Sequence, residues 1–348
     1  MTSLAKTIVA TGLSSGIGLE VLKQLLEQAV PYSVILGARD VEAARDAVSR
    51  LQYDRAANAV TALPVELADL RTVKTFAQQA LDRVGSGKID YLLLNAGMLK
   101  PAEKGSHGKW CEAAVVNHFC ESVSFVSTWS VESGYVWPVT WLSVCIFISS
   151  ALFDTPAAGQ VGCVQVANRG SFLGCYSQRA RCWYVRFALP VGTDPGAQRS
   201  GRAGWLTDGI AALEARLANG SGADGYSVYA GSKFAQLLAA HWWRRQLKGQ
   251  CDVVAVSPGL VPATGLGRGQ GFAISPDLPD AKSVPEGAQS VIAALSRGDF
   301  PEDPDRIFLT SWGEWWDRDV IGKTLDKELQ DSWCPGREEL ERDAGVVS

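Results

Sequence analysis

Short apolar runs alternate with amphipathic segments from residue 7 to residue 97. Four runs, at residues 7–10, 33–38, 59–64 and 89–94, predict buried strands because they are mostly apolar and carry few charges. The segments between them, residues 17–28, 41–51 and 72–84, place apolar side chains at helical spacing. Strands that alternate with helices predict an α/β fold with a doubly wound parallel sheet, Rossmann-like in its arrangement.

The same alternation returns in the C-terminal part of the chain. Residues 209–217 and 226–246 predict helices, residues 251–256 a buried strand and residues 284–295 a further helix. Residues 265–285 are rich in Gly and Pro and are expected to form a substrate loop.

The α/β pattern fails between residues 119 and 208. This stretch is rich in Trp and Arg, and residues 133–153 carry no charge. Three interpretations stay open: an insertion such as a lid, a membrane-spanning element, or non-native sequence from a retained intron or a shifted reading frame. The uncharged run is long enough to cross a bilayer, but Pro138 interrupts it and a span would sever a doubly wound sheet. We therefore treat residues 120–207 as an insertion or a non-native segment within a single domain of residues 1–348.

Composition and charge exclude several classes of protein. The 348 residues are 47% hydrophobic and 20% charged, and their net charge of −4 gives no general attraction to nucleic acid or to an anionic membrane. The eight cysteines contain no Cys-x-x-Cys pair and the three histidines lack metal-ligand spacing, so buried free thiols and no metal are expected. No secretory signal precedes the first strand, so a cytoplasmic location is expected.

Candidate chemistry begins at the glycine-rich turn after the first strand. A strand, such a turn and a helix N-terminus form an anion site, because free N–H groups and the positive end of the helix dipole face the same place. Gly12 suits the tight turn, Gly16 lets the backbone approach a pyrophosphate and Gly18 lets the helix pack on the sheet. A plain structural turn is the alternative. The expected cofactor-binding residues here are Gly12, Ser14, Ser15, Gly16, Ile17 and Gly18.

The end of the second strand indicates which dinucleotide binds. A dinucleotide fold places the adenosine ribose here, where an acidic side chain would accept from the 2′-hydroxyl. Arg39 offers instead a planar cation suited to a 2′-phosphate, which favours NADP(H) over NAD(H). Asp40, one residue later, weakens that preference, and a solvated arginine is the alternative.

Five motifs in one order resemble the short-chain dehydrogenase/reductase family. They are Thr11-Gly12-x3-Gly16-Ile17-Gly18, Asn95-Ala96-Gly97, Asn117, Tyr229-x3-Lys233, and Ser257-Pro258-Gly259 with Thr264 beyond it. The Gly-Ala-Arg-Asp strand end is most similar to the retinol-dehydrogenase and protochlorophyllide-reductase-like branch. The resemblance covers about residues 5–119 and 222–335 and implies a nicotinamide-dependent oxidoreductase.

The resemblance also implies individual roles. Asn95, Ala96, Gly97, Pro258 and Gly259 would border the cofactor. Thr264 would meet the nicotinamide carboxamide, and Asn117 would position a water in a proton relay.

Two positions fit the family less well. The family has Asp where this chain has Glu66, before the leucine, here Leu67, whose backbone borders the adenine; the longer carboxylate can serve the same purpose. Residues 142–150 best imitate the fifth strand of the family, which would make Ser150 the catalytic serine. A core strand with incidental serines explains the same residues.

Tyr229 and Lys233 lie one helical turn apart and therefore on one face of a helix. The ammonium favours the phenolate, so Tyr229 can protonate a carbonyl oxygen as a hydride arrives and take the proton back in reverse. Lys233 would also hold the nicotinamide ribose. A helix tyrosine beside a solvated lysine is the alternative interpretation.

These features predict an NADP(H)-dependent oxidoreductase that acts on a carbonyl or alcohol of an apolar small molecule. The alternatives are a catalytically inactive dinucleotide-binding protein, whose middle segment displaces the serine-bearing strand, and a membrane-tethered form. Trp312, Trp315 and Trp316 line an apolar pocket or pack in the core. The sequence leaves the substrate and the oligomeric state open.

Overall fold

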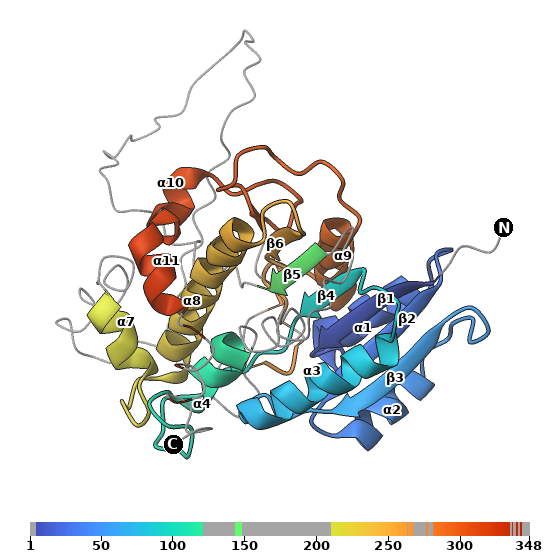
Figure 1. Ribbon diagram of the computed structural model, residues 1–348, viewed down its shortest axis with the longest axis horizontal. Helices are drawn as coiled ribbons and strands as arrows, with labels where there is room; N and C mark the ends of the chain where they lie inside the picture. The colour runs from blue at the N-terminus through green and yellow to red at the C-terminus, as the bar shows by residue number, and fades with distance from the viewer. Residues whose placement is uncertain are drawn as a thin grey trace, which may run out of the picture.

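A seven-stranded sheet organises the protein, as a computed structural model shows (Figure 1). The structure describes residues 5–120, 143–147, 210–262, 264–266, 276–277 and 281–334, with residues 336, 339 and 342. The strand order is β3-β2-β1-β4-β5-β6-β7, and every neighbouring pair runs parallel. The strands are β1 (Lys6–Thr11), β2 (Tyr32–Ala38), β3 (Ala59–Pro64), β4 (Tyr91–Leu94), β5 (Ser143–Phe147), β6 (Asp252–Val256) and β7 (Phe308–Leu309).

Helices cover both faces of this sheet. In chain order they are α1 (Gly16–Leu26), α2 (Val41–Ser49), α3 (Leu70–Val84), α4 (Glu112–Ala114), which continues as the π-helix η1 (Val115–Phe119), α7 (Ile210–Leu217), α8 (Gly225–Gln246), α9 (Val284–Leu295), α10 (Arg318–Ile321), the 3₁₀ helix η4 (Gly322–Leu325) and α11 (Lys327–Trp333). Sequence pattern and structure agree on the bounds of the shared elements to within about three residues. The predicted doubly wound parallel fold is confirmed.

Two apolar clusters hold the layers together. Helices α1, α2 and α9 pack on one face of the sheet, while α3, η1, α8 and α11 pack on the other. Successive residues of β1 enter opposite clusters, Ile8 and Ala10 one and Val9 the other. Both faces of the central strands are therefore buried, which explains why these strands read as continuous apolar runs.

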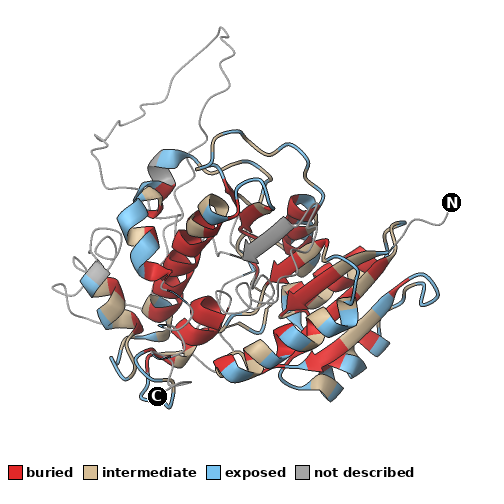
Figure 2. Cartoon of the chain, in the orientation of Figure 1, coloured by how far each residue is buried: buried red, intermediate tan, exposed pale blue. Residues whose placement is uncertain are grey.

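Helix α8 is buried on all sides along most of its length (Figure 2). Every residue from position 228 to position 241 is buried, between the sheet, α7, η1 and α11. An ion pair of 2.7 Å between Arg245 and Asp331 joins α8 to α11. A helix buried in this way must satisfy its polar side chains internally, since water does not reach them.

The middle segment contributes one strand to the sheet. Ser143–Phe147 forms β5, which pairs with β4 through Leu94–Ile146 and with β6 through Phe147–Val256. This agrees with the expected strand at residues 142–150 and places part of the segment 120–207 inside the core sheet. The pattern does not predict β7 or α11, both short elements on the C-terminal side.

The four cysteines that the structure describes with their surroundings, Cys111, Cys120, Cys251 and Cys334, are free and buried, as expected. Burial raises the pKa of the Cys251 thiol to about 12. Burial also raises the pKa of the Cys111 and Cys334 thiols, so these three cysteines stay protonated at neutral pH.

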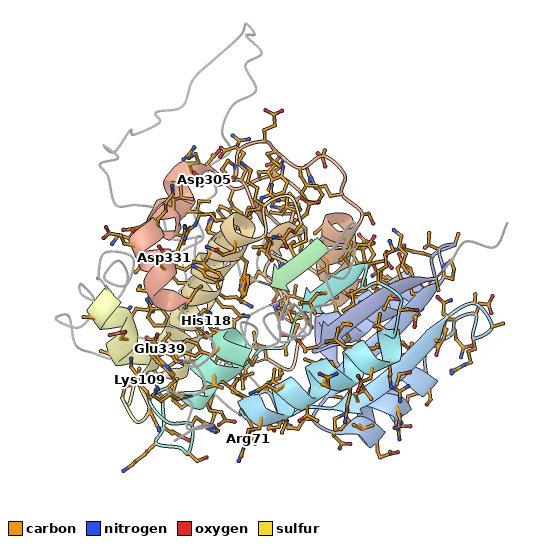
Figure 3. All side chains as sticks on the ribbon, viewed as in Figure 1. Arg71, Lys109, His118, Asp305, Asp331 and Glu339 are labelled. Carbon is orange, nitrogen blue, oxygen red and sulfur yellow. The ribbon has the colours of Figure 1, made fainter. Side chains whose placement is uncertain are left out.

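A buried histidine makes stability depend on pH. His118 lies on η1, which continues from α4 (Figure 3). Its ring is fully buried, and its Nε2 donates a hydrogen bond of 3.0 Å to the carbonyl oxygen of Trp333. Burial lowers the pKa of His118 to about 4, from the usual value of about 6.5. Between these two pKa values His118 binds a proton in the unfolded chain but not in the native protein. The free energy of unfolding therefore decreases as the pH falls from about 6.5 to about 4.

We expect the free energy of unfolding to fall between pH 7 and pH 4, with His118 contributing on the order of 3 kcal/mol. Urea unfolding at several pH values measures this slope. His118→Phe cannot titrate and should show lower stability at pH 7, because the bond to Trp333 is lost, but a shallower decline below it. Part of the slope should remain in this variant, because burial also lowers the pKa of His241, to about 3. A slope equal to that of the wild type would show that His118 does not contribute to it.

Candidate active site

The turn between β1 and α1 depends on its glycines at two different contacts. Gly12 has φ +72°, and a Cβ there would lie 2.5 Å from the amide nitrogen of Ala96. A Cβ on Gly18 would lie 2.0 Å from the carbonyl oxygen of Gly12, so only glycine lets α1 approach this closely. Gly16 has φ +55° but no atom within 4 Å of its Cβ position, so it faces open space. The first two glycines serve packing, and the third leaves room for a ligand.

The N-terminus of α1 has no side-chain cap. Its N-cap residue, the exposed Ser15, makes no capping hydrogen bond, whereas α2, α3, α8 and α9 are each capped by a side chain, namely Asp40, Asp69, Asp224 and Ser283. The backbone N–H groups of the first turn of α1 and the positive end of its dipole therefore suit an anion. Ser14, half-buried, and Ile17 complete this turn.

Asn95 ties this turn to the neighbouring strand. Its Nδ2 donates a hydrogen bond of 2.6 Å to the carbonyl oxygen of Gly12. Because β1 and β4 are paired up to Thr11 and Leu94, the residues that follow them emerge side by side. Asn95-Ala96-Gly97 therefore lies against the glycine turn.

Gly97 brings the two remaining motifs together. A Cβ on Gly97 would lie 3.4 Å from Nζ of Lys233 and 3.5 Å from Oδ1 of Asn117. Asn117 is fully buried in η1 and accepts a hydrogen bond of 2.8 Å from the amide of Met98, while its Nδ2 donates to Ser232 Oγ at 2.9 Å. The irregular helix η1 is thereby fixed to both the β4 end and α8.

Tyr229 and Lys233 share one face of α8, as their spacing predicts. The Lys233 ammonium lies 5.6 Å from the centroid of the Tyr229 ring, and both residues are buried. Lys233 Nζ also donates a hydrogen bond of 3.0 Å to Oε1 of Gln236, which is fully buried. Ser232 and Gln236 are thus bonded directly to two of the predicted site residues, Asn117 and Lys233. The family motif does not point to them, although their spacing from Tyr229 along the helix does.

The adenosine end contains Arg39 and Glu66. Arg39 is exposed and makes no hydrogen bond or ion pair within the described residues, whereas the Asp40 carboxylate accepts from the Ala43 amide at 2.9 Å and caps α2. Glu66 is half-buried, and its Oε1 accepts from the Ala68 amide at 3.1 Å. Leu67 packs against the core cluster at the same strand end.

The residues after β6 form the other side of the same sheet edge. Pro258 precedes Gly259, whose φ is +84° and whose Cβ would lie 3.0 Å from Cβ of Ser311. Thr264, half-buried, lies beyond this turn. Two of the tryptophans predicted to line a pocket or pack in the core differ in burial. Trp316 stacks on Phe308 in the core, whereas Trp312 is 68% exposed.

Ser150 lies outside the described residues, and β5 ends at Phe147 shortly before it. Its role stays a prediction. Within the described residues no cluster of His, Cys, Asp or Glu could hold a metal ion. None of the helices described is both long and apolar enough to span a bilayer, and the described part of the uncharged run at residues 133–153 is strand β5.

Comparison with known proteins gives the class of this chain. A profile of short chain dehydrogenases matches residues 6–127. A short-chain dehydrogenase/reductase of Pestalotiopsis microspora is 43% identical over 342 residues, which cover 97% of this chain and 99% of that protein. Retinol dehydrogenase 13 of Homo sapiens is 27% identical over 95 residues, 27% of this chain and 28% of that protein. The chain therefore belongs to the short-chain dehydrogenase/reductase family and is an oxidoreductase, as the five motifs predict.

Solved structures support the same fold. The NADPH-bound carbonyl reductase from chicken fatty liver has a TM-score of 0.55 at 15% identity, over 90% of this chain and 94% of that one. A short-chain dehydrogenase/reductase from Mycobacterium ulcerans has a TM-score of 0.54 at 13% identity, over 98% of this chain and 99% of that one.

Substitution of two glycines by alanine should separate packing from binding. Gly18→Ala places a methyl group into the Gly12 carbonyl and should destabilise the fold by several degrees in Tm. Gly16→Ala meets no atom, so it should cost only about 1–2 kcal/mol for its left-handed backbone while weakening dinucleotide binding. Thermal unfolding and dinucleotide titration measure the two effects. A Gly16→Ala protein that binds as well as the wild type would contradict a pyrophosphate site at this turn.

Proposed function

We propose that this chain is an NADP(H)-dependent oxidoreductase that transfers a hydride between nicotinamide and a carbonyl or alcohol carbon of an apolar small molecule. One observation carries the proposal. Asn95 donates a hydrogen bond to the glycine turn, and a Cβ on Gly97, two residues later, would lie 3.4 Å from the Lys233 ammonium, which stands beside the Tyr229 ring. An anion site and an acid–base pair therefore meet at the ends of two adjacent strands, where open α/β sheets bind ligands.

The residues at this edge fit a dinucleotide. The open space at Gly16 and the uncapped N-terminus of α1 suit the pyrophosphate. Lys233 would hold the nicotinamide ribose. Pro258, Gly259 and Thr264 lie after β6, on the side of the sheet edge where the nicotinamide is proposed to bind.

The choice of NADP(H) rests on Arg39. Asp40 is engaged as the cap of α2, so the exposed guanidinium is the charged group left for the ribose 2′ position. The chicken liver carbonyl reductase, which shares the fold, holds NADPH, in line with this choice.

Bound nicotinamide would supply or accept the hydride. Tyr229 then donates its phenolic proton to the carbonyl oxygen and recovers it in the reverse direction. The Lys233 ammonium stabilises the phenolate that remains. Asn117 is proposed to hold the water that links this pair to solvent, and Ser150 to donate a second hydrogen bond to the developing oxyanion.

The structure gives no support to the alternative of an inactive dinucleotide-binding protein. It requires the middle segment to displace the fifth strand, yet β5 pairs between β4 and β6. The alignment with the Pestalotiopsis relative leaves only a few per cent of this chain outside it and so extends across the same segment. Both observations support one domain with an inserted segment that contributes a strand.

Tyr229→Phe tests the assigned acid. The variant keeps the aromatic ring and its packing but removes the proton, so it should bind NADP(H) normally and lose about 10²–10⁴ in kcat. Tyr226→Phe, the same change three residues earlier on α8 at a residue 40% exposed, is the control and should stay near wild type. Wild-type turnover in Tyr229→Phe would refute the mechanism.

Arg39→Asp tests the cofactor. Loss of a charged phosphate contact should weaken NADP(H) binding by roughly 1.5–3 kcal/mol and leave NAD(H) binding unchanged or stronger. Fluorescence titration of both dinucleotides measures the preference. Arg83→Asp, the same change at an exposed residue of α3, is the control. A wild type that prefers NAD(H) would overturn the assignment.

A further inference from the structure

Four polar side chains form a line inside the buried helix α8. Tyr229, Ser232, Lys233 and Gln236 follow the i, i+3, i+4, i+7 spacing of one helical face, and each is at most 8% exposed. Most of the side chains around this line are apolar members of the core cluster. Ser232 is engaged at both ends: its Oγ accepts from Asn117 Nδ2 at 2.9 Å and donates to the Tyr229 carbonyl oxygen at 2.8 Å.

Gln236 ends this line at the ammonium. Gln236 lies one turn beyond Lys233 on α8. Its Oε1 accepts a hydrogen bond of 3.0 Å from Lys233 Nζ. Neither side chain is open to water, since Lys233 is 3% and Gln236 0% exposed. An ammonium buried in this way keeps its charge by donating hydrogen bonds, and here one of its three N–H donors is directed to a neutral amide oxygen.

The neutrality of this acceptor matters for Tyr229. A carboxylate at the same distance would form an ion pair with the ammonium and cancel much of its field at the phenol. An amide oxygen also holds the ammonium in place, but it is neutral, so the positive charge of Lys233 still acts on the phenol. A Cβ on Gly97 would lie 3.4 Å from the same Nζ, so the ammonium lies between the segment that follows β4 and Gln236.

We propose that Gln236 is a positioning residue of the active site: its neutral amide holds the Lys233 ammonium beside Tyr229 and at the proposed cofactor ribose without neutralising it. This role rests on the proposed function, but the effect of Gln236 on Lys233 and Tyr229 can be measured without turnover.

On α8 itself, burial lowers the pKa of His241 to about 3, so this ring is neutral throughout the pH range in which a phenol ionises. Charged groups on the neighbouring elements are paired. His118 on η1 is bonded to Trp333, Asp331 on α11 pairs with Arg245, and Glu214 on α7 pairs with Lys109. The phenol titration is therefore expected to respond chiefly to the charge at position 236.

The test is the ionisation of Tyr229 in the dinucleotide-free protein. Absorbance of tyrosinate is followed against pH, and the Tyr229 contribution is the difference between each protein and its Tyr229→Phe counterpart. Gln236→Glu should raise the pH midpoint of Tyr229 ionisation by about one unit or more, because the new carboxylate neutralises the ammonium. Gln246→Glu makes the same change on the same helix about 15 Å away, at an exposed residue, and should leave the midpoint unchanged.

Gln236→Met provides a second variant of similar length with no strong acceptor, in case the glutamate variant does not fold. It should weaken NADP(H) binding about tenfold, because the ammonium is no longer held at the ribose. A midpoint in Gln236→Glu equal to that of the wild type, or unchanged midpoint and affinity in Gln236→Met, would overturn the proposal. A purely structural role would lower Tm in these variants without moving either reading.

Different measurements test the proposed function and the role proposed for Gln236. A wild type that binds no dinucleotide and reduces no carbonyl defeats the proposed function, while the midpoint in Gln236→Glu still decides whether Gln236 governs Lys233. If turnover is present, the pH profile of kcat/KM should shift in the same direction as the phenol titration.

Discussion

The hydrogen bond from Asn95 to the carbonyl oxygen of Gly12 is the contact on which the site depends. It exists because β1 and β4 are neighbours in a parallel sheet, so the residues after each strand meet at one edge. The glycine turn needs Gly12 and Gly18 for this approach, since a side chain at either would collide with backbone. From the same edge Gly97 reaches Lys233. The sheet order therefore brings the proposed dinucleotide site and the proposed acid–base pair to one edge of the sheet.

The second constraint is the burial of α8. The polar side chains next to Tyr229 and Lys233 find their partners inside the protein: Ser232 donates to the Tyr229 carbonyl oxygen, and Gln236 accepts from the Lys233 ammonium. Burial also removes water that would screen the ammonium from the phenol, so their mutual effect is larger than on a surface. Stability and chemistry thus draw on the same packed interface of α8, η1 and α11.

Sequence reasoning predicted the features that depend on local pattern. The parallel sheet follows from apolar runs alternating with helical segments, and Gly12, Asn95, Asn117, Tyr229 and Lys233 follow from motifs that the structure brings together. Features that depend on distant pairing were harder to predict. The pairing of β5 depends on β4 and β6, strands far from it in the sequence, and the role proposed for Gln236 depends on burial that no motif records. Ser150 remains a sequence prediction, because it lies outside the described residues.

The most direct test of the account follows the hydride itself. Wild-type protein is incubated with NADPH that carries deuterium at both hydrogen positions of the nicotinamide C4, together with a panel of apolar aldehydes and ketones, and the products are analysed by mass spectrometry. The account predicts an alcohol that carries one deuterium on its carbinol carbon, formed in proportion to the NADP⁺ released. Tight binding of NADPH with no deuterium in any product would contradict it.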